Sequence, residues 1–263
     1  MIIVERLWAN NPLRNFHYLV ACSDTGEALA IDPLDWRSCL QRAQQRGWRI
    51  GQILNTHEHH DHIGGNAALV QATGAQVLAH AGAATRIGGV DRGLRAGDVI
   101  RVGRSAELEC LDTPGHTMTH ICALAHADTP ALFSGDTLFN AGVGNCRSGD
   151  PEALFRTCSA LLARLDPATR LYPGHDYLAN NLGFTLHIEP GNAAALDWQQ
   201  RAAQQQGPDA PLLTLAEELR FNTFFRLQEA GVIAGLRARL PALSATPERR
   251  EVFLALRELR NSW

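Results

Sequence analysis

Short apolar runs and amphipathic stretches alternate over the first two-thirds of the chain, and this alternation predicts strands mixed with helices. Apolar runs at Phe16–Ala21 and Ala28–Ile31, separated by a turn at Gly26, predict a β-hairpin. Asp35 is a suitable N-cap for the helical pattern that follows it, and Gly47 is a suitable end for that helix. The chain is therefore expected to begin with a hairpin followed by a helix.

Further strands are predicted wherever a short apolar run lies between turn residues. These runs lie at 50–54, 76–79, 98–102, 106–111, 121–125 and 131–134. A second helix is predicted after Gly64-Gly65-Asn66 and ends at Gly74, and Asp150-Pro151 forms the cap and first turn of a third that runs through Leu165. This mixture predicts an α/β fold in which helices cover the sheets.

Beyond about residue 175 the strand patterns disappear and only helical patterns remain. These patterns lie at 192–206, 214–220 and 247–260, joined by segments that contain proline. We therefore predict two domains, an α/β domain over 1–175 and a helical C-terminal domain over 176–263.

The composition is that of an ordinary globular protein, with 45% hydrophobic and 19% charged residues in a chain of 263. No apolar run is long enough to span a bilayer and the first residues show no signal-peptide pattern. We therefore expect a cytoplasmic protein with reduced cysteines and no membrane contact. The net charge of −3 gives no reason to expect nucleic-acid binding. All 24 basic residues are arginines, so an anionic substrate group has to be held by arginine or by neutral donors.

The segment after the predicted strand at 50–54 is rich in metal-binding side chains. It places four histidines and two carboxylates in the six positions from His57 to His62. Imidazole and carboxylate groups are ligands for zinc-like ions, and side chains two positions apart on extended backbone point to the same side. His57 and His59 can therefore share one metal ion, while Asp61 and His62 can reach a neighbouring position.

Three further ligand-type residues each follow a strand-like run and a sharp turn. The segments are Thr113-Pro114-Gly115-His116-Thr117, Ser134-Gly135-Asp136-Thr137 and Tyr172-Pro173-Gly174-His175. Glycine and proline turn the chain after each strand and expose the next side chain at the edge of the sheet. This repeated construction marks His116, Asp136 and His175 as candidate ligands.

The motif His-x-His-x-Asp-His, followed in this order by His116, Asp136 and His175, resembles the metallo-β-lactamase superfamily. The resemblance implies a four-layer αββα sandwich and a site for two divalent metal ions. The first ion would be held by His57, His59 and His116. The second would be held by Asp61, His62 and His175, with Asp136 bridging both. Zinc is the first expectation for the metal, and iron and manganese are alternatives that such sites accept.

Within that superfamily the chain resembles glyoxalase II, the hydroxyacylglutathione hydrolases, over nearly its whole length. The similarity continues through Ser134–Phe139, Pro173–Tyr177, Asn180–Leu182 and His187–Asn192 and into the helical tail.

This resemblance implies a monomeric enzyme that hydrolyses S-2-hydroxyacylglutathione, such as S-D-lactoylglutathione, to glutathione and a 2-hydroxy acid in methylglyoxal detoxification. A hydroxide between the two metal ions would attack the thioester, with Asp61 and Asp136 as the catalytic residues. The helical domain would bind the glutathione portion.

The resemblance also implies substrate contacts, and here the chain departs from the family pattern. Tyr177 and Arg226 would hold the glutathione portion, Arg226 by pairing with a carboxylate. The family has a basic residue and then an aromatic residue two positions on, whereas this chain has Asn145 and Arg147 at those places. Thr223 also replaces a proline before Arg226. We assign Asn145 and Arg147 to the substrate site and leave open whether they change the thiol carrier.

Two other reactions are compatible with a metal site of this kind. A persulfide dioxygenase-like oxidoreductase that uses one iron shares the His-x-His-x-Asp-His core, but such relatives use only part of the ligand set and lack a long helical tail. Hydrolysis of a lactone or another ester would use the same metal pair, and the matches at Tyr177 and Arg226 argue against it. We therefore expect a thioester hydrolase.

Overall fold

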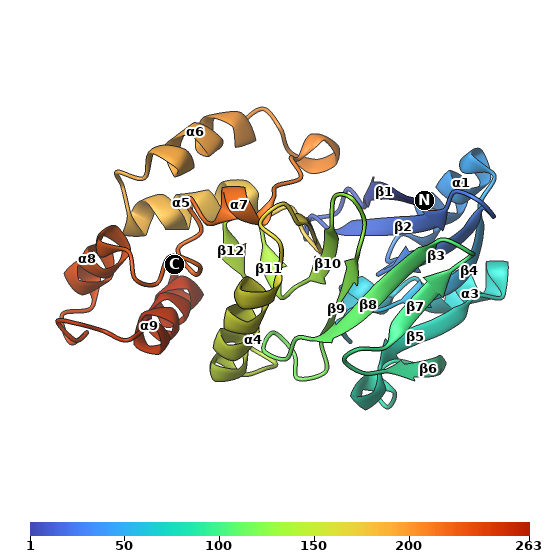
Figure 1. Cartoon of the computed structure of the whole chain (residues 1–263), viewed down its shortest axis with the longest axis horizontal. Coiled ribbons are helices and arrows are strands. Elements are labelled where there is room, and N and C mark those ends of the chain that lie inside the picture. Colours follow the sequence, from blue (N-terminus) through green and yellow to red (C-terminus); the bar gives the residue numbers. More distant parts are fainter.

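Two β-sheets face each other in the N-terminal two-thirds of the chain (Figure 1), and the computed structural model describes all 263 residues. The first sheet has the order β1-β2-β3-β4-β5-β6, with strands β1 (Ile2–Trp8), β2 (Phe16–Cys22), β3 (Glu27–Ile31), β4 (Arg49–Leu54), β5 (Gln76–His80) and β6 (Val90–Leu94). The second has the order β13-β10-β9-β8-β7, with strands β7 (Val99–Val102), β8 (Ala106–Asp112), β9 (Ile121–Ala125), β10 (Ala131–Gly135) and β13 (Arg170–Pro173). A separate small hairpin is formed by β11 (Leu138–Phe139) and β12 (Gly142–Val143).

Helices cover the outer faces of both sheets. The α/β part contains α1 (Trp36–Arg46), α2 (His60–Ile63), α3 (Asn66–Thr73) and α4 (Pro151–Arg164). The C-terminal part is helical, with α5 (Leu178–Ile188), α6 (Ala193–Ala202), α7 (Leu215–Glu218), α8 (Ala230–Arg239) and α9 (Arg249–Ser262). Short 3-10 turns lie at Ala81–Ala83 and Gly207–Asp209. None of these helices has the length and apolar character needed to cross a membrane.

Three groups of buried apolar side chains lie between these layers. One, which includes Tyr18 and Phe133, fills the space between the two sheets. A second packs α1 and α3 on the first sheet, and the third packs α4 and the C-terminal helices on the second sheet. The layer order is therefore helix, sheet, sheet, helix, which confirms the predicted α/β sandwich with a helical C-terminal region.

Strand direction brings several polar loops to one end of the sandwich. β3, β4 and β5 run parallel in the first sheet, and β10 and β13 run parallel in the second. The Tyr18 hydroxyl donates to the Pro173 carbonyl across the two sheets at 2.6 Å. The loops that follow β4, β10 and β13 therefore meet at the carboxyl ends of these strands, where the predicted ligands lie.

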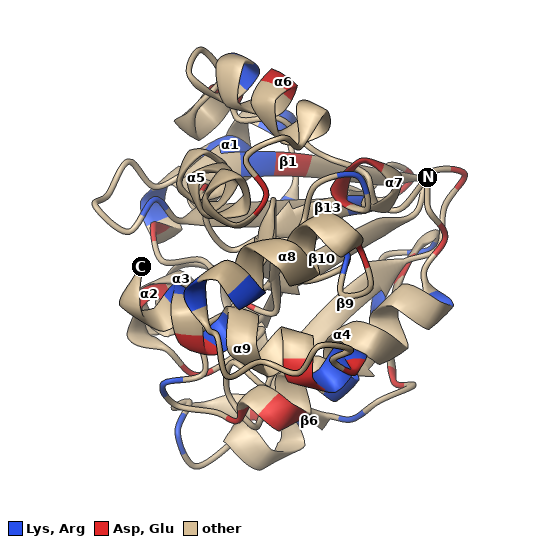
Figure 2. Ribbon diagram, turned by 90° about the vertical axis from the view of Figure 1, so that its left-hand side faces the viewer, with Lys and Arg blue, Asp and Glu red and all other residues tan.

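The helical end of the molecule carries a mixed surface charge. Seen from that end, basic and acidic positions are interspersed along α4 and α9 (Figure 2). One cross-domain ion pair joins Arg250 of α9 to Glu152 of α4. The helical region thus packs on the second sheet through apolar side chains and forms an ion pair with α4.

Candidate metal centre and active site

The structure brings all seven predicted ligands together at the carboxyl ends of the central strands. In the first group, Nδ1 of His59 lies 3.0 Å from Nε2 of His57 and 3.0 Å from Nε2 of His116. In the second group, Nε2 of His62 lies 3.2 Å from Nε2 of His175. We call these seven side chains the histidine cluster: His57, His59, Asp61, His62, His116, Asp136 and His175.

Asp136 lies between the two groups. Its Oδ1 atom is 3.3 Å from Nε2 of His62 and 3.3 Å from Nε2 of His175. Its Oδ2 atom is 3.5 Å from Nε2 of His116. One carboxylate oxygen thus faces each group, as a bridging ligand requires.

The outward ring nitrogens of the second group have fixed partners. Nδ1 of His62 lies 2.9 Å from Oδ2 of Asp32, and Nδ1 of His175 donates to the carbonyl of Leu13 at 2.7 Å. These acceptors hold the proton on Nδ1 and leave the Nε2 lone pair facing inward.

The first group follows the same principle. Nδ1 of His116 donates to the carbonyl of Asn145 at 2.7 Å, and Nε2 of His59 lies 2.8 Å from Oγ of Ser148. Nδ1 of His57 lies 3.0 Å from Oγ1 of Thr56, whose hydroxyl donates to Asp32. Every imidazole of the cluster therefore turns a lone pair toward the centre.

This donor set fits two divalent cations. Ligand atoms on a tetrahedral zinc ion with bonds of about 2.0–2.1 Å lie roughly 3.3 Å apart, and the inward nitrogens are separated by 3.0 and 3.2 Å. Lone pairs that face one another at this distance repel unless a positive charge lies between them. Oδ1 of Asp136 is buried without a hydrogen-bond donor, which a cation would satisfy.

The electrostatics of the centre favour positive charge. Burial raises the pKa of Asp136, but His175 and His62 outweigh burial and hold this pKa well below its ordinary value. Burial lowers the pKa of His57 well below its ordinary value, so this ring stays neutral. Burial also lowers the pKa of His62, but Asp136 and Asp32 outweigh it and raise this pKa well above the ordinary value.

His120 stabilises the centre through hydrogen bonds. Its Nε2 accepts the backbone N–H of Asp136 at 3.1 Å, and its Nδ1 lies 2.8 Å from Oγ1 of Thr113. Burial lowers its pKa well below the ordinary value, so the ring is a neutral acceptor that fixes the bridging carboxylate.

Asp61 is the most accessible carboxylate of the cluster. Its Oδ2 atom accepts from Nδ2 of Asn15 at 3.0 Å and lies 3.4 Å from Nε2 of His175. Burial raises its pKa, but His62 and the Asn15 hydrogen bond outweigh burial and lower it. An ionised carboxylate therefore stands at the open side of the centre.

One cavity opens onto the histidine cluster, and a second cavity adjoins it. The first has a volume of about 350 Å³ and is lined by five of the cluster residues together with Leu13 and Ser148. The second has a volume of about 260 Å³ and lies against the C-terminal helices. Three residues line both cavities, namely Asn145, Arg147 and Tyr177.

Comparison with known proteins identifies the family. The chain matches the model of the metallo-beta-lactamase superfamily over residues 18–175 and the model of the hydroxyacylglutathione hydrolase C-terminus over residues 176–263. It is 57% identical over 263 residues to a hydroxyacylglutathione hydrolase from a Polaromonas species, with 100% of both chains covered. The chain belongs to the hydroxyacylglutathione hydrolase family. The family predicted from the sequence is confirmed.

Solved structures share the fold. ETHE1 from Myxococcus xanthus has a TM-score of 0.69 and 26% identity, and the match covers 98% of this chain and 91% of that one. TTHA1623, crystallised in a di-iron-bound form, has a TM-score of 0.54 and 31% identity, with 65% of this chain and 91% of that chain covered. These likenesses confirm the metallo-β-lactamase fold predicted from the sequence.

Three of the four predicted substrate residues line the cavities of this hydroxyacylglutathione hydrolase family member. The Tyr177 ring stacks on the His175 ring with a centroid distance of 4.8 Å, and burial raises the Tyr177 pKa well above its ordinary value. The side-chain oxygen of Asn145 accepts a hydrogen bond from the backbone N–H of Arg147 at 3.1 Å. The Arg147 guanidinium is exposed and free at the junction of the two cavities.

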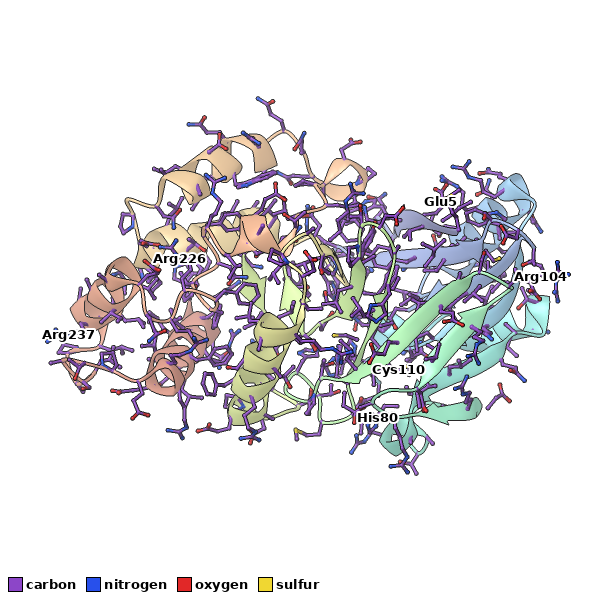
Figure 3. All side chains as sticks on the ribbon, viewed as in Figure 1. Glu5, His80, Arg104, Cys110, Arg226 and Arg237 are labelled. Atoms are coloured by element: carbon purple, nitrogen blue, oxygen red, sulfur yellow. The ribbon has the colours of Figure 1, made fainter.

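Arg226 is the exception, because the structure places it outside both cavities. Its Nη2 lies 2.9 Å from Oε1 of Glu189, its Nη1 donates to the Arg220 carbonyl, and it lines neither cavity. Figure 3 shows it among the C-terminal helices. Its charge is used to hold that region together, so a substrate carboxylate has to find another partner.

Arg257 and Arg260 line the second cavity, and sequence reasoning missed both. They lie three positions apart on α9 and therefore share one face of that helix. The sequence contained a signal for these residues, because two arginines on one helix face can bind an anion and the chain has no lysine. Only the fold, however, shows that this face of α9 points toward the histidine cluster.

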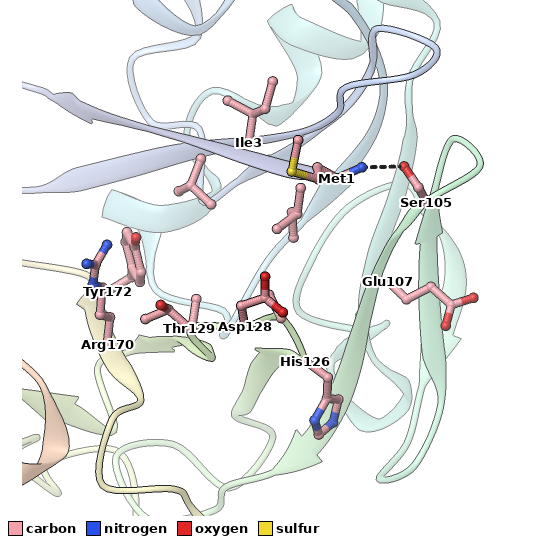
Figure 4. A pocket seen from close by; sticks show the side chains of 13 residues that line it. Met1, Ile3, Ser105, Glu107, His126, Asp128, Thr129, Arg170 and Tyr172 are labelled. Atoms are coloured by element: carbon pink, nitrogen blue, oxygen red, sulfur yellow. Dashed lines mark hydrogen bonds between the residues drawn. The ribbon is translucent and has the colours of Figure 1, made fainter.

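A larger cavity lies elsewhere in the molecule. It has a volume of about 570 Å³ and is bounded by the start of β1, the turn between β9 and β10, and Arg170 (Figure 4). It contains no member of the histidine cluster. The smaller cavities, with their ligand-type residues, are therefore the candidate active site.

Proposed function

We propose that this chain hydrolyses S-2-hydroxyacylglutathione thioesters, such as S-D-lactoylglutathione, to glutathione and a 2-hydroxy acid. The observation that carries the proposal is the contact between two cavities of different chemistry. One holds the histidine cluster and the other is lined by arginines and aromatic rings. A thioester carbonyl at the cluster would leave its glutathione portion in the second cavity.

The cluster residues would hold two divalent ions in this proposal. When bound, such ions lower the pKa of a water molecule between them and stabilise negative charge on the carbonyl oxygen. Asp136 would face both ions, and Asp61 would orient the attacking water from the open side. A thiol of pKa about 8.5 leaves readily as a thiolate, so the chain needs no dedicated acid at the sulfur.

Charge and shape support glutathione as the thiol carrier. Glutathione carries two carboxylates, and the second cavity offers Arg147 and Arg260 as cationic donors. Arg257 also lines this cavity, but it is buried and donates to the carbonyls of Val143 and Gly144. Tyr177 would lie between acyl group and thiol portion, because it lines both cavities. Arg147 would supply the charge that Asn145 lacks.

Zinc is the metal we propose first, with iron and manganese as alternatives. Imidazole and carboxylate donors accept all three, and availability decides among them. Iron has support from TTHA1623, which was crystallised in a di-iron-bound form. We further propose that the chain acts as a monomer.

The proposed carrier is tested by exchanging the thiol while the acyl group stays the same. Hydrolysis of S-D-lactoylglutathione is compared with that of the D-lactoyl thioester of N-acetylcysteamine, which lacks both carboxylates. We expect kcat/KM to be roughly 100-fold higher for the glutathione thioester, since two ion pairs are lost in the other. Equal values would show that the arginine-lined cavity does not select glutathione.

A further inference from the structure

The hairpin formed by β11 and β12 belongs to neither large sheet and lies against the C-terminal helices (Figure 1). Oγ of Ser134 on β10 donates to the Leu138 carbonyl at 2.8 Å, and the other contacts described below come from the C-terminal helices. Nδ2 of Asn181 on α5 donates to the Asn140 carbonyl at 2.9 Å. On α9, Nη1 of Arg257 donates to the carbonyls of Val143 and Gly144 at 3.2 and 3.0 Å. Helices more than 35 residues away in sequence thus fix the backbone of this hairpin.

Glu218 at the end of α7 makes the tightest of these contacts. Its carboxylate oxygens lie 2.8 and 3.1 Å from the backbone nitrogen of Ala141, and Nδ2 of Asn222 donates to Oε2 at 2.9 Å. Glu218 is completely buried. Ala141 has a φ of +60°, in the left-handed region that residues with a Cβ rarely adopt. The Glu218 side chain therefore stabilises an unfavourable turn at the tip of the hairpin.

The hairpin leads directly to the metal centre. Asn145, two residues after β12, presents the carbonyl that accepts Nδ1–H of His116 at 2.7 Å. A Cβ added to Gly144 would lie 2.0 Å from the Asp136 carbonyl and 3.1 Å from Cβ of His116. This segment packs closely against the cluster. A displacement of the hairpin would therefore move the Asn145 carbonyl, which is the acceptor that orients His116.

We propose that Glu218 is a positioning residue, which sets the orientation of His116 through the β11–β12 hairpin. The C-terminal helices then contribute to the metal centre as well as to the second cavity. The kinetic consequence of this role rests on the proposed function, whereas its consequence for metal binding does not.

The test replaces the carboxylate while keeping the side-chain volume. With the amide oxygen of Glu218→Gln in the place of Oε2, the NH₂ group takes the place of Oε1, 3.1 Å from the Ala141 nitrogen, where a donor now faces a donor and weakens the contact. Metal-free wild type and variant are titrated with Co²⁺, and its visible absorption reports the geometry of the site. We expect about tenfold weaker binding of one of two Co²⁺ ions, an altered spectrum, and a kcat about tenfold lower, as for other residues that orient metal ligands.

Glu217→Gln is the matched control, because Glu217 caps the same helix through Thr214 and does not contact the hairpin. It should lower the melting temperature and leave Co²⁺ binding and spectrum unchanged.

If Glu218→Gln does not fold, Asn222→Ala, which removes a bond to Gly142, should show the same changes more weakly. Wild-type Co²⁺ affinity, spectrum and kcat in a folded Glu218→Gln variant would overturn the proposal. Absence of thioesterase activity in the wild type would instead remove the proposed function and leave the Co²⁺ comparison decisive for Glu218.

Discussion

At the scale of single residues, the site depends on which partner each charged or polar group has found. Arg226 and Arg260 illustrate this, since both lie in the helical region and both are arginines. Arg226 is paired with Glu189, whereas Arg260 lines the second cavity and packs over the Trp263 ring at 5.1 Å. The two side chains therefore have different tasks, although their sequence contexts do not distinguish them.

This contrast gives a paired prediction. Arg260→Ala should raise KM for S-D-lactoylglutathione roughly tenfold, equivalent to about 1.4 kcal/mol, with little change in kcat, because a carboxylate partner is lost. Arg226→Ala should lower the melting temperature and leave KM unchanged, because only a structural ion pair is lost. Steady-state kinetics and thermal unfolding of both variants measure this. A raised KM in Arg226→Ala alone would restore the role that the sequence suggested.

Glu218 also predicts how stability depends on pH. Burial raises its pKa from 4.5 to about 8, although hydrogen bonds from Asn222 and Ala141 offset part of the effect. The folded chain therefore holds the proton more tightly than the unfolded chain, and this contribution to stability is lost as pH rises from about 4.5 to about 8. Between pH 6 and pH 8.5, the free energy of unfolding measured in urea should fall less in Glu218→Gln than in the wild type. An identical pH dependence of the unfolding free energy in both proteins would contradict the raised pKa of Glu218.

At the scale of elements, the site depends on strands that end at the same edge and on glycines that let their loops touch. A Cβ at Gly174, just after β13, would lie 2.5 Å from Oδ1 of Asp136 and 2.8 Å from Cε1 of His62. A Cβ at Gly51 on β4 would meet nothing within 4 Å. Glycine is thus required at the first position and dispensable at the second.

Gly174→Ala should therefore displace the bridging carboxylate. We expect loss of at least one metal ion per chain and a fall in kcat of about 100-fold, since the added methyl group occupies the place of the Asp136 oxygen. Gly51→Ala is the control and should keep both metal content and kcat. Metal analysis after dialysis, together with kinetics, decides the matter. Two bound ions in an active Gly174→Ala protein would show that the loop can shift without cost.

The elements near the site were predictable to different degrees. The capped helices α1 and α4 follow from Asp35, Gly47 and Asp150, because caps are local chemistry. The sequence analysis missed β1, β6, β11, β12, α5 and α8. The α5 helix is buried on several sides, so its sequence shows no clean apolar stripe, and β11 and β12 have two residues each, too few for any period. The positions of β11 and β12 are set by side chains that are distant in sequence, such as Glu218.

At the scale of the whole molecule, the histidine cluster could be predicted as a group, because histidine and aspartate after turns have few other uses. The acceptors behind the ligands could not, since Leu13 and Asn145 act through backbone carbonyls and carry no sequence signature. The same holds for the face of α9 that lines the second cavity. Sequence thus gives the chemistry of the centre, and the fold is needed to find what orients it and what flanks it.

Removal of the metals should destabilise the whole chain. The inward lone pairs and the unpartnered Oδ1 of Asp136 need positive charge between them, and ligands that bind only the folded state stabilise it. We expect the melting temperature to fall by at least several degrees after chelation and to recover when Zn²⁺ is added back. Equal melting temperatures for stripped and reloaded protein would mean that the cluster does not bind metal tightly.

The most direct test is the steady-state hydrolysis of S-D-lactoylglutathione by protein shown to contain two metal ions per chain. The account predicts a kcat/KM of roughly 10⁴ M⁻¹s⁻¹ or more, abolished by stripping the metals and restored by their return. Weak or absent turnover by protein that contains both ions would contradict it. In that case Asn145 and Arg147 would point to a different thiol or ester.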